Sequence, residues 1–213
     1  FLDLGDFQIL SNSPELFLER RGLRVATRPI KGTRPRGATA DADAGLIEEL
    51  RRDAKERAEH LMIVDLERSD LGRIAEIGSI EVEDFAAVES YATLHHLEST
   101  VCGKVPPELP FSAFLRALFP GGSITGAPKI RAMQILEELE TEGRGFYTGG
   151  ILHYPPGRDF SMSICIRTAT VRGGRVRYAA GGGLVADSNV EAEHAECLLK
   201  ARAFFTAATG ETP

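Results

Sequence analysis

The sequence contains few cysteines and lacks long apolar runs. Three of its 213 residues are cysteines, Cys102, Cys165 and Cys197. An odd number of widely separated cysteines argues against a disulfide framework and a zinc site, and it predicts buried or incidental thiols in a reducing compartment, the cytoplasm. No apolar run approaches the roughly 18 residues that a membrane-spanning helix needs, so we expect no membrane association.

Positive charge and export signals are also lacking. The chain has 25 basic and 31 acidic residues, which gives a formal net charge of −6. A field of this sign repels the phosphates of nucleic acid, so we expect no nucleic-acid partner. No signal peptide is visible, and the chain begins with Phe1 in a strand-like pattern. We therefore expect it to begin within a longer protein.

Turn residues and hydrophobic periodicity predict the elements. Helices are expected over 43–63, 111–118 and 190–208, and after Pro128, where Ile130, Met133, Leu136 and Leu139 share one face. Strands are expected over 6–11, 16–25, 80–88, 151–154, 161–171 and 175–180. Asp43 is the expected N-cap of the first helix, Thr27–Gly37 a basic loop, and Gly173-Gly174 a hairpin turn. Because turns rather than regular βα units join the strands, we predict an α+β fold with antiparallel sheet.

Two pairs of carboxylates each lie on one face of a predicted helix. Glu193 and Glu196 share a face with Lys200, and Glu56 and Glu59 lie one turn apart on the first helix. Carboxylates from two helices that face one pocket can hold Mg²⁺ and leave positions open for substrate oxygens. The alternative is a solvated helix face with ion pairs one turn apart.

Two glycine-rich loops are candidates for binding an anion. Gly181, Gly182 and Gly183 lie between a strand and the last helix, where backbone N–H groups can approach a ligand. A flexible turn is the alternative there. Pro120–Lys129 lacks the Gly-Lys-Ser/Thr sequence of a phosphate loop, but its glycines and hydroxyls before a helix suit a carboxylate. A simple helix cap at Ser123 is the alternative.

Basic side chains supply the remaining candidates. Lys31 lies in a run with several arginines, and neighbouring cations favour a neutral amine that can act as a nucleophile. The same run could bind an anion, or nothing. Arg167 lies in a strand-like pattern, and an inward-facing arginine needs an anionic partner. His95 and His96 are by default structural, although a histidine can also protonate a leaving hydroxyl.

Together these segments resemble the chorismate-utilising enzymes, which include anthranilate, aminodeoxychorismate, isochorismate and salicylate synthases. The matching stretches follow the family's order along nearly the whole chain. They include residues 13–15, 29–33, 58–66, 70–73, 96–101, 119–129, 147–149, 166–168, 181–183 and 187–188, with Glu193, Glu196 and Lys200. The resemblance implies an antiparallel β-sandwich flanked by helices, with the site between the sheets. It also implies that residues 1–208 are the C-terminal part of this catalytic domain and 209–213 a tail.

The resemblance implies roles for individual residues. Glu59 and Glu196 would bind Mg²⁺ directly, with Glu56 and Glu193 acting through water, and the metal would hold the ring carboxylate of chorismate. The expected contacts to the substrate carboxylates come from Ser123, Tyr147, Arg167, Gly181, Gly182, Gly183 and Lys200. Glu15 and His96 would transfer protons around the ring hydroxyl that leaves.

Lys31 distinguishes members of the family. Pro29-Ile-Lys-Gly-Thr33 is similar to the aminodeoxychorismate synthases, whereas anthranilate synthases have alanine in place of the lysine. The resemblance implies that Lys31 forms a covalent adduct and directs ammonia from a glutamine amidotransferase partner to carbon 4. The product would be 4-amino-4-deoxychorismate, a precursor of p-aminobenzoate and folate. The alternatives are an anthranilate synthase, less strongly an isochorismate or salicylate synthase, and a non-catalytic chorismate-binding module.

Overall fold

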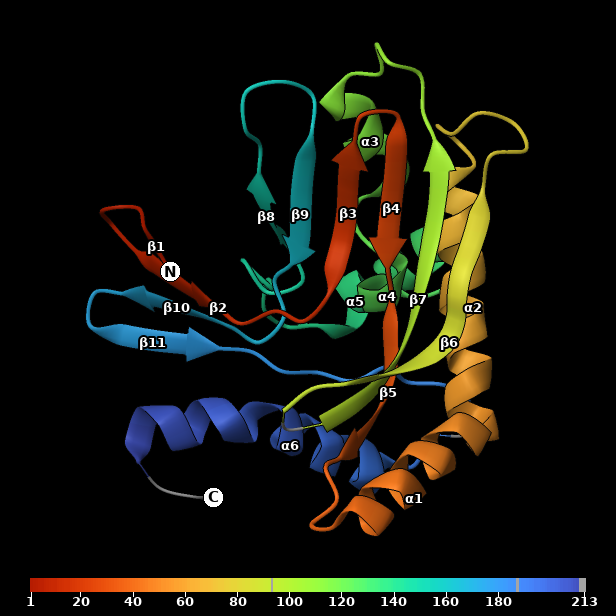
Figure 1. The fold of residues 1–213 in the computed structure, drawn as a ribbon. Coiled ribbons are helices and arrows are strands. Elements are labelled where there is room, and N and C mark those ends of the chain that lie inside the picture. Colours follow the sequence, from red (N-terminus) through yellow and green to blue (C-terminus); the bar gives the residue numbers. More distant parts are fainter. Residues whose placement is uncertain (93, 187, 211–213) are drawn as a thin grey trace. The chain divides into compact units, whose positions relative to one another are not determined.

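The computed structural model describes residues 1–92, 94–186 and 188–210, which form an α+β fold with antiparallel sheets (Figure 1). This confirms the predicted fold class. A four-stranded sheet has the order β1-β2-β10-β11. Its strands are β1 (Leu2–Asp3), β2 (Gln8–Ser11), β10 (Thr168–Arg172) and β11 (Arg175–Tyr178). Gly173 and Gly174 join β10 to β11 with positive φ angles of 55° and 73°, as the predicted tight hairpin requires.

A seven-stranded sheet has the order β5-β7-β4-β3-β9-β8, with β6 also paired to β7. Its strands are β3 (Leu16–Arg21), β4 (Arg24–Arg28), β5 (Ile30–Pro35), β6 (Glu81–Ser90), β7 (Leu94–Lys104), β8 (Gly150–His153) and β9 (Phe160–Ile164). Strands β4 and β5 pair with successive parts of one edge of β7, and β6 pairs with the other edge. The prediction of a basic loop over residues 27–37 is therefore wrong, because most of this segment lies in β4 and β5.

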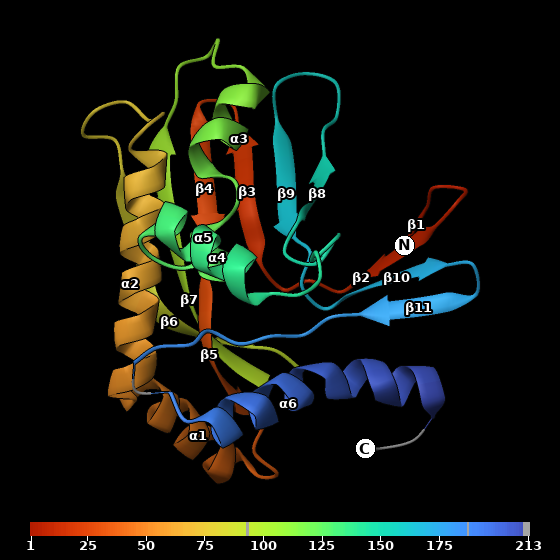
Figure 2. The same cartoon turned by 180° about the vertical axis from the view of Figure 1, so that it is seen from behind.

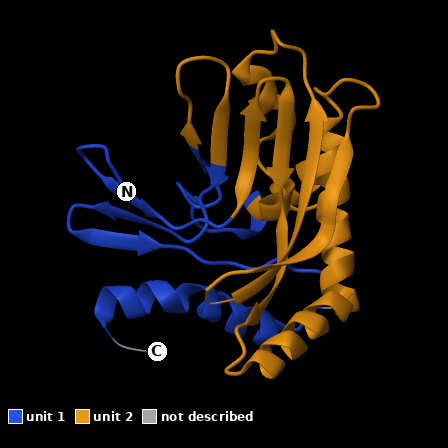
Figure 3. Ribbon diagram, in the orientation of Figure 1, with its two compact units in different colours: residues 1–14, 137–151, 163–213 blue, residues 15–136, 152–162 orange. Residues whose placement is uncertain are grey.

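The chain divides into two compact units (Figure 3). Unit 1 comprises residues 1–14, 137–151 and 163–213, and unit 2 comprises residues 15–136 and 152–162. The four-stranded sheet lies in unit 1, and β3 to β7 lie in unit 2. Of the expected tail, Thr209 ends a helix and Gly210 caps it, while 211–213 lie outside the described residues.

Helices of unit 2 cover the seven-stranded sheet (Figure 2). They are α1 (Ala40–Arg52), α2 (Ala54–Leu71), α3 (Phe111–Leu118) and α4 (Gly122–Thr125). The single helix predicted over 43–63 is thus two helices. Asp53 has an extended ψ of 107°, and its carboxylate accepts a hydrogen bond from the backbone N–H of Glu56 at 3.0 Å, which starts α2. Thr39, and not Asp43, caps α1.

Two further helices are α5 (Lys129–Leu139) and α6 (Val190–Thr209). The predicted apolar face of α5 is solvent-exposed, since Ile130 is 75% and Leu139 is 73% exposed. The predicted strand 161–171 is divided between two sheets as β9 and β10, with a break at Cys165–Arg167. Among the described residues, no helix combines the length and the apolar character needed to cross a membrane.

The thiols match the prediction from cysteine spacing. Cys102 and Cys165 are buried, Cys197 is partly buried, and all three are free. Cys102 donates a hydrogen bond from its thiol to Glu83, and burial raises its pKa. A buried thiol with a raised pKa is a poor nucleophile, so Cys102 is structural.

Candidate functional site

Lys31 projects from a bulge in β5. Lys31 pairs with Leu97 and Thr33 pairs with His96, so Gly32 is an extra residue between two consecutive partners on β7. Gly32 has a φ of 68°, a conformation that only glycine adopts without strain. A Cβ atom at Gly32 would lie 2.9 Å from the Leu50 side chain and 3.3 Å from Oε2 of Glu56. Glycine therefore lets this strand approach the helices closely.

The Lys31 ammonium faces a carboxylate. Its Nζ donates a hydrogen bond to Oε2 of Glu59 on α2 at 3.1 Å, and both side chains are largely buried. Two arginines of the run turn elsewhere: Arg34 binds Glu49 and Asp53, and Arg36 binds Asp43. The expectation that the arginines of the run surround Lys31 with positive charge is therefore wrong for Arg34 and Arg36, because each of these two has an acidic partner.

Glu56 and Glu59 lie one turn apart on α2, as predicted. Burial raises the pKa of Glu56, and the negative charges of Glu59 and Asp53 raise it further. Glu59 is bound by Lys31 on Oε2 and approached by Lys55 on Oε1 at 3.8 Å. Two hard carboxylate oxygen donors with mutual repulsion suit a divalent cation such as Mg²⁺.

The second carboxylate pair lies on α6 in unit 1. Asn189 caps this helix, and the buried Glu193 accepts a hydrogen bond from the Ser188 hydroxyl at 2.6 Å. Lys200 donates to Oε1 of Glu196 at 2.7 Å and to the carbonyl of Gly181 at 3.1 Å. The shared helix face predicted for Glu196 and Lys200 is thus confirmed, and their ion pair is the one that the alternative, a solvated helix face, expects.

The glycine run packs closely against other predicted site residues. A Cβ atom at Gly181 would lie 2.6 Å from the hydroxyl oxygen of Tyr147, and one at Gly182 would lie 3.2 Å from Oε2 of Glu193. Unit 1 therefore brings Tyr147, Gly181, Glu193 and Lys200 together. Gly183 follows in the same irregular segment, and Asp187 of the matching motif lies outside the described residues.

The metal prediction joins residues from both units. Among the residues that the structure describes, no group of three or more histidine, cysteine, aspartate or glutamate side chains is placed to hold a metal ion. Glu56 and Glu59 form one pair in unit 2, and Glu193 and Glu196 form another in unit 1. The chemistry of each pair fits Mg²⁺. Their assignment to a single ion stays a prediction.

Glu15 and Ser123 are directly bonded. The Ser123 hydroxyl on α4 donates to Oε1 of Glu15 at 2.6 Å, and Glu15 is only 7% exposed. Burial raises the pKa of Glu15 to about 7, although the bond from Ser123 and the charge of Lys31 act in the opposite direction. A carboxyl with this pKa can carry a proton at neutral pH, as a general acid must. Ser123 holds Glu15 in place.

The two histidines have different surroundings. His95 is buried and links Asp43 to Ser90 through its two ring nitrogens, at 2.9 and 2.8 Å, which is a structural arrangement. Nδ1 of His96 lies 2.9 Å from the carbonyl of Gly32, in the bulge next to Lys31. Because a carbonyl only accepts, Nδ1 of His96 carries a proton. His96 thus fixes the backbone that presents Lys31.

Comparison with known proteins identifies the family. Residues 1–206 match the profile of the family described as chorismate binding enzyme. The chain belongs to this family.

Relatives carry two different activities in their names. The aminodeoxychorismate synthase of Streptomyces griseus is 50% identical over 94% of this chain and 28% of its own length. Component 1 of the Bacillus subtilis (strain 168) aminodeoxychorismate synthase is 45% identical over 94% of this chain and 43% of its own. The crystal structure of anthranilate synthase component I from Streptococcus pneumoniae TIGR4 superposes with a TM-score of 0.84 at 41% identity, covering 94% of this chain and 44% of that one. This chain therefore spans less than half the length of these relatives.

Arg167 does not lie in the strand that the sequence of this chorismate binding enzyme predicts for it. It lies in the break between β9 and β10 with a φ of 48°, and its side chain is partly exposed. Its backbone carbonyl accepts a hydrogen bond from the N–H of Asn12 at 3.1 Å. The predicted strand position is wrong, because the chain changes sheets here. Its role in binding a carboxylate stays a prediction.

Sequence reasoning missed Glu67. This residue is 3% exposed on the face of α2 that also buries Ile63 and Leu71. Burial, followed by the charges of Glu15 and Asp70, raises its pKa to about 8. Glu67 lies four residues after Ile63 and four residues before Leu71. This spacing places its carboxylate within an apolar stripe of the helix, and the sequence alone contained that signal.

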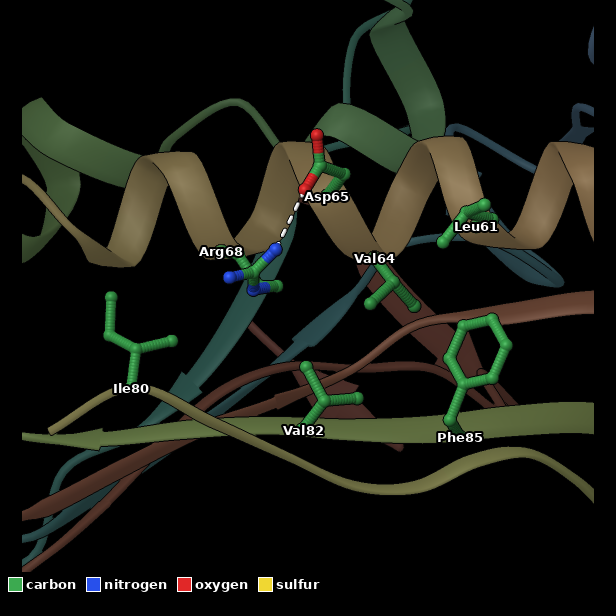
Figure 4. Close-up of a pocket in the computed structure, with 7 residues that line it drawn as sticks. All are labelled: Leu61, Val64, Asp65, Arg68, Ile80, Val82 and Phe85. Atoms are coloured by element: carbon green, nitrogen blue, oxygen red, sulfur yellow. Dashed lines mark hydrogen bonds and ion pairs between the residues drawn. The ribbon is translucent and has the colours of Figure 1, made fainter. Parts of the chain in front are cut away.

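A cavity of about 310 Å³ lies apart from these residues, between α2 and β6 (Figure 4). It is lined by Leu61, Val64, Asp65, Arg68, Ile80, Val82 and Phe85. The lining is mainly apolar, and Arg68 and Asp65 pair with each other at 2.9 Å across one side. None of the predicted site residues lines this cavity.

Proposed function

We propose that this chain is the chorismate-binding part of an aminodeoxychorismate synthase component 1, which aminates chorismate to 4-amino-4-deoxychorismate. The observation that carries the proposal is the placement of Lys31. Its amine projects from a bulged strand and is largely buried, in the same unit as Glu15, a carboxyl whose pKa burial raises to about 7. Nucleophile and proton donor are thus present in one unit. The names of the two synthase relatives agree with this choice.

The reaction assigns a separate task to each residue. The Lys31 amine adds to ring carbon 2 while the bond between carbon 4 and its hydroxyl breaks, and the ring double bonds shift. Glu15 supplies the proton with which the hydroxyl leaves as water. Ammonia then adds at carbon 4, and the bond from carbon 2 to Lys31 breaks. His96 keeps the bulge that presents Lys31 in place.

Carboxylate binding is the task of the remaining residues. Glu59 and Glu196 would hold Mg²⁺, with Glu56 and Glu193 acting through water, and the ion would supply positive charge to the ring carboxylate. Tyr147, Arg167 and the backbone N–H groups of residues 181–183 would bind the carboxylate of the pyruvyl group. Ser123 and Lys200 would complete the carboxylate contacts. A glutamine amidotransferase would supply the ammonia, in the cytoplasm and as part of folate synthesis.

Anthranilate synthase is the second candidate, supported by the structural similarity to the Streptococcus pneumoniae enzyme. In that reaction ammonia itself adds to carbon 2, and loss of pyruvate gives anthranilate. A lysine at position 31 has no task in that route. A chorismate-binding module without activity is a third candidate, and the number of matching site residues argues against it.

Product identity tests the proposal. The protein in its full natural length is incubated with chorismate, Mg²⁺ and ammonium, and the products are separated by liquid chromatography with mass detection. We expect 4-amino-4-deoxychorismate, which an added lyase converts to p-aminobenzoate. Anthranilate would favour the second candidate, and a lack of any turnover would favour the binding module.

A further inference from the structure

The two carboxylates proposed as direct Mg²⁺ ligands, Glu59 and Glu196, each form an ion pair with a lysine. Nζ of Lys31 lies 3.1 Å from Oε2 of Glu59, and Nζ of Lys200 lies 2.7 Å from Oε1 of Glu196. In both units, therefore, an ammonium lies on an oxygen that a metal ion would take. The lysines in question are also the two that the proposed function assigns to the substrate.

The Lys31 contact is the better protected of the two. The side chains of Lys31 and Glu59 are 21% and 13% exposed, whereas those of Lys200 and Glu196 are 31% and 50% exposed. Water screens an ion pair less when it is buried, so Lys31 neutralises Glu59 more effectively than Lys200 neutralises Glu196. The bulge at Gly32, bonded to His96, holds the Lys31 backbone beside α2.

Glu59 also provides an internal comparison. Lys55 approaches its other oxygen, Oε1, at 3.8 Å, and the Lys55 side chain is 52% exposed. Both lysines carry the same charge and serve the same carboxylate. Only Lys31 combines a hydrogen bond with burial, so only Lys31 has to leave before a cation can take Oε2 of Glu59.

We propose that Lys31 is the resident counter-ion of the metal site, and that a divalent cation which takes Oε2 of Glu59 releases the Lys31 amine toward the substrate. This inference rests on the proposed function, because it uses the assignment of Glu59 as a metal ligand. Two cations that compete for one carboxylate oxygen weaken each other's binding by the same factor. The amine is thus withheld until the metal is present.

Mg²⁺ affinity in the absence of substrate tests the inference. The full-length protein and its Lys31→Met variant are titrated with MgCl₂ by calorimetry at one pH and one ionic strength. Removal of a buried competing charge should lower the Kd for Mg²⁺ about fivefold. Lys55→Met, which removes an equal charge from the same carboxylate, should change the Kd less than about twofold.

Three results would overturn the inference. They are an unchanged or higher Kd in Lys31→Met, an equal decrease in Lys55→Met, and a lack of Mg²⁺ binding by all three proteins. The first two leave the proposed function intact, provided that Glu59→Gln weakens Mg²⁺ binding. The third also removes Mg²⁺ from the proposed function, while the product assay still decides the reaction.

Amine reactivity gives a second test in the unmodified protein. Acylation by an N-hydroxysuccinimide ester is measured residue by residue with mass spectrometry, with and without saturating MgCl₂. We expect acylation of Lys31 to increase severalfold with Mg²⁺. Lys129 is ion-paired with Asp70 and 13% exposed, so it is a matched lysine whose acylation should stay constant. Constant acylation of Lys31 at saturating Mg²⁺ would contradict the inference.

Discussion

Two ion pairs of similar composition are built in different ways. Glu196 and Lys200 are one turn apart on α6, whereas Glu59 of α2 meets Lys31 of β5, 28 positions earlier in the chain. The helical pair follows from spacing alone, and both of its side chains are in contact with water. The strand-to-helix pair depends on a bulge and on burial. The tertiary contact is thus the harder of the two to predict, and it is the one that we propose to control the reactivity of Lys31.

The largest expected effect is on the metal requirement. Glu59→Ala and Glu196→Ala should each remove Mg²⁺-dependent turnover, since each deletes a proposed direct ligand. Initial rates are measured across a range of MgCl₂ at saturating chorismate, with the exposed Glu81→Ala as the control. An unchanged rate in either ligand variant would contradict the metal assignment for that unit.

The bulge that supports the strand-to-helix pair should be intolerant of a side chain. Gly32→Ala combines a φ of 68° with a contact of 2.9 Å to Leu50, so we expect a loss of about 3 kcal/mol in unfolding free energy. Gly22→Ala is the matched control, because its φ is 60° but its Cβ would meet open space. Strain alone should cost about 1 kcal/mol there. Urea denaturation measures both, and equal losses would show that the approach to α2 is unimportant.

Unit 2 contains two buried glutamates, Glu15 and Glu67, whose raised pKa values predict that the stability of the fold depends on pH. The pKa values of Glu15 and Glu67 are raised from 4.5 to about 7 and about 8 in the folded chain. Between pH 4.5 and these raised pKa values, the two carboxyls stay protonated in the folded state but lose their protons in the unfolded state. Their contribution to the free energy of unfolding is therefore fully present below about pH 4.5 and is lost as the pH rises to about 8.

Glu67→Gln should flatten this decline, because the amide stays neutral throughout. Unfolding free energies are compared between pH 5 and pH 8, and the difference between the variant and the unmodified protein should change by roughly 3 kcal/mol. Glu81→Gln, at an exposed position of β6, serves as the control. A parallel decline in Glu67→Gln would mean that Glu67 is ionised in the folded protein.

The smallest effects should come from the two pairs themselves. A double-mutant cycle should give a coupling energy of about 1 kcal/mol for Lys31 and Glu59, and about 0.3 kcal/mol for Glu196 and Lys200. Thermal or urea denaturation without Mg²⁺ measures both. Equal coupling energies would remove the distinction between the buried and the solvated pair.

The sequence predicted those parts of the fold whose signals are local. Helix α6, the Gly173-Gly174 hairpin and the short helix α3 follow from periodicity and turn residues. The split at Asp53 had a local signal too, because an aspartate three residues before Glu56 is a capping pattern. Strand β7 had none, since it is buried along nearly all of its length and shows no alternation.

The candidate site divides in the same way. Glu196 with Lys200, and Glu56 with Glu59, could be placed on common helix faces from spacing. The partner of Lys31 could not, because Pro29-Ile-Lys-Gly-Thr33 has the composition of a loop and becomes a strand only when paired with β7. Arg167 was misplaced for a similar reason: its apolar neighbours suggested one strand, and the change of sheet at this point depends on tertiary pairing.

The most direct test of the central claim is the product formed by Lys31→Ala. Chorismate, Mg²⁺ and ammonium are supplied to the full-length variant and to the unmodified protein, and products are quantified by liquid chromatography with mass detection. The account predicts that 4-amino-4-deoxychorismate is abolished or sharply reduced, since the amine that adds to carbon 2 is missing. The same product at the full rate would contradict the covalent role of Lys31.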